Sequence, residues 1–346
     1  MKVLIIKLTS MGDVLHLMPA LSDLYKHDSK VEVDWVVEDG FADIPAWHPA
    51  VRRVIRAGTR RWRRLNWQNI KEFRCFVKDL RSERYDIVID AQGLMKSAGL
   101  SLFARLKPNG KRVGYCKDSI KESFASRCYT QKVTVNRDQH AILRLRQLFS
   151  LAFDYDLSAE SKITRTLNYQ IRLSSKASDT LNRRTIFFIH GTTWLSKHLP
   201  DQIWRDLLDL VIDDGYQVKI CWGNENERQR AEWIAQQNVD VEVLPKLTLT
   251  ELAKELQNAA GAISVDTGLG HLTAALNIPA VSVYGATNAA LTGALGKEQI
   301  HIQTNYPCSP CMLKQCDKIT NQVDQPPCYL TLSAAEIWQT LYEKIA

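Results

Sequence analysis

The stretch VLIIKLTSMGD at residues 3–13 joins an apolar run to a glycine turn that ends in an acid. A second stretch of this kind, SVDTGLGH at residues 264–271, stands in the C-terminal half of the chain. A strand that runs into a glycine turn and a helix start presents unpaired backbone N–H groups, which bind anions. The repeated layout predicts two α/β domains that close on one ligand.

Length and composition agree with two globular domains. The chain has 346 residues, of which 45% are hydrophobic, and single domains of this length are uncommon. No apolar run approaches the roughly 18 residues that indicate a membrane span. The N-terminal apolar run is interrupted by Lys7 and by Met11–Asp13, so we interpret it as a core strand and expect the protein in the cytosol.

Positive charge is concentrated in the first half of the chain. Residues 51–150 hold 24 Lys and Arg against 8 Asp and Glu, whereas residues 166–346 hold 15 against 19. Seven arginines without a lysine lie close together, namely Arg52, Arg53, Arg56, Arg60, Arg61, Arg63 and Arg64. Arginine forks bind phosphate and carboxylate in a bidentate manner, so the run predicts an acidic partner. The alternatives are a solvated loop and a nucleic-acid site, but no nucleic-acid-binding signature accompanies it.

Strand and helix patterns alternate along the whole chain. The expected strands are Val3–Leu8, Val31–Val37, Val51–Ile55, Ile87–Asp90, Arg112–Tyr115, Thr185–His190, Gln217–Trp222, Val241–Leu244, Gly261–Val265, Ala280–Tyr284 and Ile300–Gln303. Short β-branched runs separated by helices predict a doubly wound α/β fold. The polar stretch Asp154–Asp179 marks the boundary, which gives domains at residues 1–165 and 166–330. We expect the last helix, within residues 331–346, to cross back onto the first domain.

A threonine-rich turn follows the first strand of the second domain. Thr192 and Thr193 can donate to phosphate oxygens, and Lys197 can compensate their charge. The alternative is a simple helix cap. Glu227 can accept hydrogen bonds from ribose hydroxyls, as acids do in other doubly wound folds, or can be an ordinary first-turn acid.

Two aspartates at helix starts allow two interpretations each. Asp266, before Thr267 and Gly268, is either an N-cap or a group that faces backbone N–H groups or sugar hydroxyls. His271, one turn further, is either a structural histidine or a ligand contact. Asp13 either caps the first helix or serves as a general base facing an interdomain cleft.

Motifs along nearly the entire chain resemble glycosyltransferase family 9, the lipopolysaccharide heptosyltransferases, and most of all its heptosyltransferase I members. The matching segments are Ser10–His16, Asp34–Glu38, Ala46–His48, Arg60–Arg63, Asp90–Leu94, Gln139–Ala141, Thr192 and Thr193 with Lys197, Val265–Leu269 and His271–Leu276. Each segment alone is weakly specific, but their combination is highly specific.

The resemblance implies a GT-B fold, in which two Rossmann-like domains face an interdomain cleft. The N-terminal domain would bind the acceptor and the C-terminal domain the ADP-sugar. The implied reaction transfers L-glycero-D-manno-heptose from ADP-heptose to a Kdo residue of the lipid A-linked inner core, with inversion and without a required cofactor. Asp13 would be the general base, and Lys197 would stabilise the leaving diphosphate.

The resemblance also distributes the binding roles. Donor-binding positions would be Thr192, Thr193, Lys197, Glu227, Asp266, Thr267, Gly268 and His271. Acceptor-side positions would be Ser10, Gly12, Arg60, Arg61, Arg63, Arg64, Gln92, Lys96 and His140. The protein would act at the cytosolic face of the bacterial inner membrane, in peripheral contact with it, and not on nucleic acid. The alternatives are addition of a later core heptose and a non-catalytic nucleotide-sugar or nucleic-acid-binding protein.

A late cysteine cluster departs from the heptosyltransferase I pattern. It consists of Cys308, Cys311, Cys316 and Cys328. Four thiols at this spacing in a cytosolic chain favour a structural zinc site over disulfides, and unligated reduced thiols are the alternative. The remaining cysteines, Cys75, Cys116, Cys128 and Cys221, lie in apolar or helical contexts and are interpreted as ordinary thiols.

Overall fold

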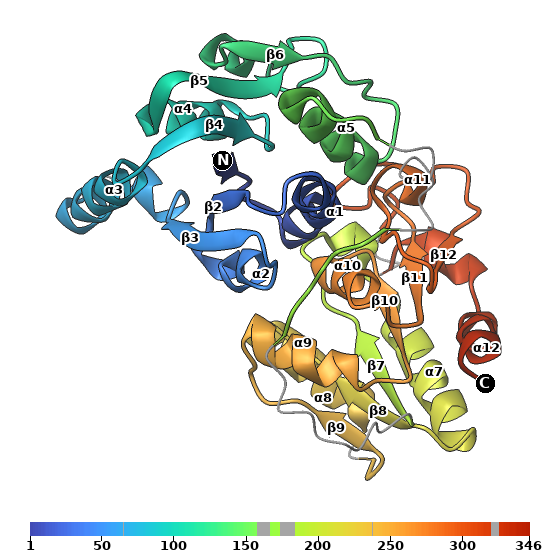
Figure 1. Ribbon diagram of the computed structural model, residues 1–346. Helices are drawn as coiled ribbons and strands as arrows, with labels where there is room; N and C mark the ends of the chain where they lie inside the picture. Colours follow the sequence, from blue (N-terminus) through green and yellow to red (C-terminus); the bar gives the residue numbers. More distant parts are fainter. Residues whose placement is uncertain (65, 158–166, 174–183, 237, 320–324) are drawn as a thin grey trace. The chain divides into compact units, whose positions relative to one another are not determined.

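The computed structural model describes the chain except residues 65, 158–166, 174–183, 237 and 320–324. The described residues form two compact units (Figure 1). Asn168–Arg172 belongs to the first unit, and Leu173–Ala346 belongs to the second. None of the described helices is long and apolar enough to cross a membrane.

The first unit is built on a six-stranded parallel sheet in the order β3-β2-β1-β4-β5-β6. Its strands are β1 (Lys2–Ile6), β2 (Glu32–Glu38), β3 (Val51–Ala57), β4 (Arg84–Asp90), β5 (Arg105–Tyr115) and β6 (Gln131–Val133). Its helices are α1 (Met11–His27), α2 (Asp43–Ala46), α3 (Trp67–Leu80), α4 (Met95–Phe103) and α5 (Ala141–Phe153).

Helices cover both faces of this sheet. Side chains of α3 and α4 pack on the face that carries Leu4 and Ile6, while α1 and α5 pack against each other. Successive strand residues point to opposite faces, and residues Val3 to Ile6 of β1 are all fully buried. Burial on both faces explains why the strands read as continuous apolar runs.

The second unit repeats this architecture in the order β12-β11-β10-β7-β8-β9. Its strands are β7 (Thr185–Ile189), β8 (Gln217–Ile220), β9 (Val241–Val243), β10 (Gly261–Val265), β11 (Ala280–Tyr284) and β12 (Gln299–Gln303). Its helices are α7 (Asp201–Asp213), α8 (Glu225–Ala235), α9 (Leu249–Gln257), α10 (Gly268–Ala275), α11 (Ala289–Thr292) and α12 (Ala334–Ile345). The two predicted doubly wound sheets are therefore confirmed.

The predicted position of the last helix is wrong. Helix α12 packs on α7, and its residues Ile337 and Leu341 are fully buried in the core of the second unit. Trp338 Nε1 also donates to Asp214 Oδ2 at 2.6 Å. An apolar stripe indicates that one face of a helix is buried, but it carries no information on which sheet covers that face.

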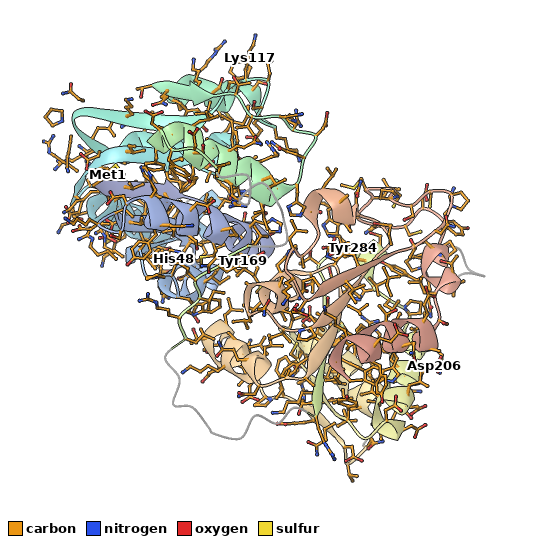
Figure 2. All side chains as sticks on the ribbon, turned by 45° about the vertical axis from the view of Figure 1, so that its right-hand side comes forward. Met1, His48, Lys117, Tyr169, Asp206 and Tyr284 are labelled. Atoms are coloured by element: carbon orange, nitrogen blue, oxygen red, sulfur yellow. The ribbon has the colours of Figure 1, made fainter. Side chains whose placement is uncertain are left out.

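The predicted domain boundary is also displaced. The described segment Asn168–Arg172 belongs to the first unit, whereas residues 166–330 were assigned to the second domain. Arg172 N–H donates to the Trp47 carbonyl at 2.9 Å, and Tyr169 is buried (Figure 2). Residues 158–166 of the polar stretch lie outside the described residues.

Candidate functional site

Asp13 occupies the third position of helix α1, directly after β1. Its Oδ2 accepts from Ser10 N–H at 2.7 Å and from Ser10 Oγ at 3.0 Å. The capping interpretation is therefore confirmed. The Asp13 side chain nevertheless remains 42% exposed, so the same carboxylate caps the helix and stays accessible to a proton donor. Gly12, next to it, is buried.

Lys7 is a functional candidate that the sequence analysis did not select. Its Nζ lies 3.4 Å from Asp13 Oδ1 and donates to the Ala91 carbonyl at 3.1 Å. The residue is only 5% exposed, and lysine at the end of a buried strand is rarely so buried unless it is paired. That rule was the available signal. Lys7 holds the Asp13 carboxylate in place and compensates its charge.

Gln92 and its neighbours shape the same loop. Gln92 Oε1 accepts from the N–H groups of Leu8 and Thr9 at 2.9 and 3.2 Å, which fixes the chain just before Asp13. Asp90 accepts from the N–H groups of Gln92 and Gly93, and burial raises its pKa. Gln92 therefore has a positioning role in this structure.

His140 is a helix cap in the same unit. It is 5% exposed, and its Nδ1 accepts from the Ile142 N–H at 3.2 Å at the start of α5. Its ring lies edge-on to that of His16, with 5.5 Å between centroids. His16 belongs to α1, so His140 joins α5 to the helix that carries Asp13.

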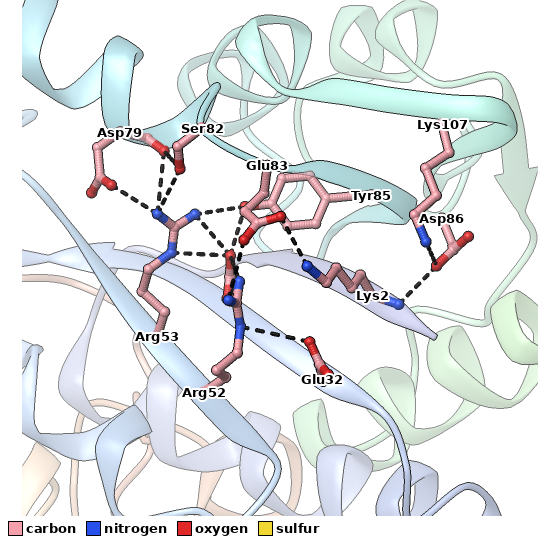
Figure 3. Close-up of polar contacts among 11 residues, drawn as sticks. Lys2, Glu32, Arg52, Arg53, Asp79, Ser82, Glu83, Tyr85, Asp86 and Lys107 are labelled. Atoms are coloured by element: carbon pink, nitrogen blue, oxygen red, sulfur yellow. Dashed lines mark hydrogen bonds and ion pairs between the residues drawn. The ribbon is translucent and has the colours of Figure 1, made fainter.

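Two of the seven clustered arginines are structural. Arg52 and Arg53 both bind Asp34, whose exposure is only 1%, at 2.8–3.0 Å. The Tyr85 hydroxyl donates to the same carboxylate at 2.7 Å, and burial raises the pKa of this phenol. Figure 3 shows both guanidinium groups within this network, where Arg53 reaches Tyr85 and Arg52 reaches Glu83.

The other five arginines form two groups, one paired with acids and one not. Arg56 and Arg61 both pair with Asp39, and Arg61 also pairs with Glu72 at 2.6 Å. Arg60, Arg63 and Arg64 are exposed, and their guanidinium groups pair with no acid in the described part of the chain. The run is thus not one uniform patch, because only these three side chains offer uncommitted forks.

Lys96 lies close to this segment. Its Nζ is 3.3 Å from Thr59 Oγ1, which itself donates to Glu38 Oε2 at 2.6 Å. Glu38 Oε1 accepts from the Arg60 N–H at 3.2 Å. Glu38 and Thr59 therefore link the Lys96 ammonium group to the backbone of Arg60.

A buried ion pair forms the centre of the polar group in the second unit. Lys197 is the last residue of the short 3-10 helix η5 (Leu195–Lys197). Its Nζ lies 2.6 Å from Asp266 Oδ2. The two side chains are 15% and 8% exposed. Thr287 donates to the same Oδ2, and Thr192 Oγ1 donates to the Asp266 carbonyl at 3.1 Å.

This geometry corrects two expectations for Asp266. It does not cap α10, since the N-cap position belongs to Thr267, and it faces a lysine ammonium group instead of backbone N–H groups. Thr287, three residues after the end of β11, was missed. Its position after a parallel strand was the signal that could have identified it.

Helix α10 starts directly at this ion pair. Gly268 is its first residue, and His271 lies one turn into it with 7% exposure. Thr193 is exposed in the turn after β7. The first backbone N–H groups of α10 therefore lie beside Lys197 and Asp266, where an anion would meet both N–H donors and a positive charge.

Glu227 lies in the first turn of α8, the helix that follows the neighbouring strand β8. Its Oε2 accepts from the Gly223 N–H at 2.7 Å, and Gly191 packs so closely that a Cβ there would lie 2.8 Å from the Glu227 carboxyl carbon. The first-turn position in α8 is confirmed. His190, just before Gly191, is neutral because burial lowers its pKa to about 3.

Comparison with known proteins identifies the family. The model of "Glycosyltransferase family 9 (heptosyltransferase)" matches residues 73–320, more than half of the chain. The chain belongs to glycosyltransferase family 9. It is therefore a glycosyltransferase, and the family resemblance noted in its motifs is confirmed.

Individual relatives agree over almost the full length. Lipopolysaccharide heptosyltransferase 1 of Pseudomonas aeruginosa is 41% identical, with 97% of this chain and 96% of that protein covered. The Escherichia coli K12 heptosyltransferase 1 is 42% identical over 87% of this chain and 92% of that protein. The solved E. coli heptosyltransferase WaaC with ADP is 37% identical, has a TM-score of 0.86, and covers 99% and 100% of the two chains. The GT-B fold is thereby confirmed for this family 9 member.

The division of the arginines generates a stability prediction. Asp34→Asn removes the charge from a buried carboxylate that holds two guanidinium groups, and we expect it to lower the free energy of unfolding by about 3–5 kcal/mol. Asp39→Asn is the matched control, because Asp39 also pairs with two arginines but is 38% exposed, and its loss should stay below about 1 kcal/mol. Urea unfolding measures both. Equal losses in the two variants would contradict the structural role of Arg52 and Arg53.

Proposed function

We propose that this enzyme transfers heptose from ADP-heptose to a Kdo residue of the lipopolysaccharide inner core. The observation that carries the proposal is the 41% identity with a heptosyltransferase 1 over 97% of the chain. A second solved structure of the E. coli enzyme contains ADP-2-deoxy-2-fluoro heptose, and this chain is 37% identical to it over 99% of its length. Identity to heptosyltransferases 2 and 3 is only 22–24%, which favours the first heptose over a later one.

The second unit supplies the donor half of the reaction. The diphosphate would lie at the start of α10, where it meets backbone N–H groups and the Lys197 ammonium. As ADP departs, negative charge grows on its terminal phosphate, and a preorganised cation stabilises that charge more than the ground state. In this proposal Lys197 supplies the charge compensation, and no metal ion is required for it. Glu227 would accept hydrogen bonds from the ribose hydroxyls.

The first unit supplies the base and the acceptor contacts. Asp13 would take the proton of the Kdo hydroxyl as that oxygen attacks the anomeric carbon, with inversion. Ser10 and Lys7 hold the carboxylate by one oxygen each, so it is oriented before the acceptor arrives. Arg60, Arg63, Arg64 and Lys96 would bind the carboxylates and phosphates of the acceptor, which suits the bidentate arginine fork.

Contact with the cytosolic face of the inner membrane forms part of the proposal. Trp67 is 83% exposed, Phe124 64% and Met95 47%. They follow β3, β5 and β4 respectively, so all three belong to connections at the carboxyl edge of the first sheet, as do Arg63 and Arg64. Apolar and aromatic side chains mixed with arginines are typical of surfaces that lie in a lipid interface.

The base assignment generates a kinetic prediction. Asp13→Asn keeps an oxygen for the Ser10 cap but cannot accept the proton, so we expect kcat to fall by ~10²–10⁴ while ADP affinity is retained. Rates are measured as ADP release with a Kdo-lipid A acceptor, and ADP affinity by calorimetry. Asp28→Asn, at the other end of α1, is the control. More than about a tenth of wild-type kcat in the Asp13 variant, a loss far below that range, would show that another group is the base.

The diphosphate assignment generates a second kinetic prediction. Lys197→Met should weaken ADP binding and should lower kcat by ~10²–10³, because the charge matters most as ADP leaves. Lys219→Met, which removes an ammonium paired with Glu255 in the same unit, should leave both constants unchanged. EDTA added to the assay should not inhibit the wild-type enzyme. Inhibition that Mg²⁺ reverses would transfer the role of Lys197 to a metal ion.

The uncommitted arginines generate a prediction for the acceptor. Replacing both Arg63 and Arg64 with Ala should raise the acceptor KM at least tenfold, since each charge-assisted contact contributes about 1.5–3 kcal/mol, and should leave ADP affinity unchanged. Arg56→Ala, from the same run but paired with Asp39, is the control.

Assays with the acceptor in anionic vesicles and with its deacylated form separate the lipid contact from the sugar contact. Trp67→Ser should impair the reaction only on vesicles. Unchanged acceptor kinetics in the arginine double variant would return Arg63 and Arg64 to the interpretation of a solvated loop.

A further inference from the structure

Four of the eight cysteines converge on one small cavity in the second unit. The cavity has a volume of about 10 Å³, and its lining includes Cys308, Cys311, Cys316 and Cys328. A space of this size accommodates roughly one water-sized particle. The other four cysteines do not line it, so the convergence is specific to the late cluster.

The chemistry of the lining is that of a thiolate site. The remaining lining residues are Ser196, Gly285, Ala286, Ser309, Pro326 and Pro327, so no histidine, carboxylate or ammonium competes with the thiols. Four cysteines in tetrahedral arrangement are a common ligand set for structural zinc, and iron takes the same set. Cys308 and Cys311 also have the two-residue spacing of such sites.

The four sulfur atoms do not yet surround a common point at metal-binding distance. Across the described ranges, no three His, Cys, Asp or Glu side chains already form a group that could hold a metal ion. All eight cysteines are free thiols. Binding would therefore draw the four sulfurs inward, which is possible because Cys308, Cys311 and Cys316 belong to a loop outside the sheet, and because metal binding commonly couples to local ordering.

The loop that carries Cys308, Cys311 and Cys316 is hydrogen-bonded to the neighbours of both residues that bind Asp266. On one side, Ser196 Oγ donates to the Leu313 carbonyl at 2.5 Å, one residue before Lys197. On the other side, Met312 N–H donates to the Ala286 carbonyl at 2.7 Å, one residue before Thr287. The loop thus contacts the immediate neighbours of both residues that bind Asp266.

We propose that Cys308, Cys311, Cys316 and Cys328 bind one thiophilic divalent metal ion, zinc or iron, which fixes the cysteine loop and thereby positions Lys197. The ion is structural: it contacts neither substrate nor the reacting atoms. Its ligands come from the loop after β12 and from Cys328 in the 3-10 helix η6 (Pro327–Thr331). The site therefore joins two segments separated in sequence.

Metal analysis of the purified full chain tests the site directly. We expect one zinc or iron ion per chain in the wild type, retained after brief dialysis against EDTA, and almost none in Cys311→Ser or Cys328→Ser. Cys75→Ser is the matched control, since Cys75 is an exposed thiol on α3. Which metal is found distinguishes zinc from iron. Wild-type protein that carries neither metal and takes up neither Zn²⁺ nor Co²⁺ on addition would overturn the proposal, as would full retention of metal in both cysteine variants.

Donor binding tests the positioning of Lys197. Release of the ion with a mercurial thiol reagent, removed afterwards with excess thiol, should weaken ADP binding about tenfold, because small displacements of a charged group are costly. Adding back Zn²⁺ or Fe²⁺ should restore it, and the Cys75 variant should behave as wild type. Unchanged ADP affinity in the metal-free protein would refute the positioning role. Metal content is measured without turnover, so its outcome is separable from that of the transfer reaction.

Discussion

Both units depend on the same constraint: a parallel sheet buried on both faces has few places for polar side chains except its two ends, and a polar side chain within a strand, such as Asp34, must be paired inside the protein. In β1 and β10 every residue from Val3 to Ile6 and from Gly261 to Val265 is buried. The chain therefore changes from apolar to polar abruptly, at Lys7 and at Asp266. Because parallel strands all end at the same edge, these changes gather at one edge of each sheet.

That constraint explains what the sequence could predict. Strands β10 and β11 were predicted with their observed bounds, because their short β-branched runs end at glycine or aspartate. Strand β6 was missed, since Gln131–Val133 is a three-residue edge strand whose burial is incomplete. Helix α12 shows a second limit of prediction from sequence. An amphipathic pattern indicates that one face of a helix is buried, but not which element covers that face.

The candidate site likewise contains residues that the sequence could point to and pairings that it could not. Asp13 and Lys197 were selected as candidates because an acid and a base stand next to strand-to-helix turns. The partner of Lys197 could not be predicted, since Asp266 is 69 residues away and meets it only because β7 and β10 are neighbours in the sheet. Likewise, no local pattern separates Arg52 and Arg53, which bind buried Asp34, from Arg63 and Arg64, whose guanidinium groups pair with no acid in the described chain. Tertiary pairing alone decides which arginines are available.

Because Asp266 is paired with Lys197, an anion that binds the Lys197 ammonium group must compete with a carboxylate of the protein itself. Between turnovers the carboxylate occupies the ammonium group, so the protein never holds an uncompensated charge at a site only 15% exposed. A diphosphate that binds Lys197, as proposed, would have to share or replace that partner, and the affinity gained would be the difference between two ion pairs, not the full strength of one. If ADP binds at Lys197 as proposed, Asp266 would take its place again when ADP leaves. Such an exchange would favour release of a highly charged product that an isolated lysine would retain.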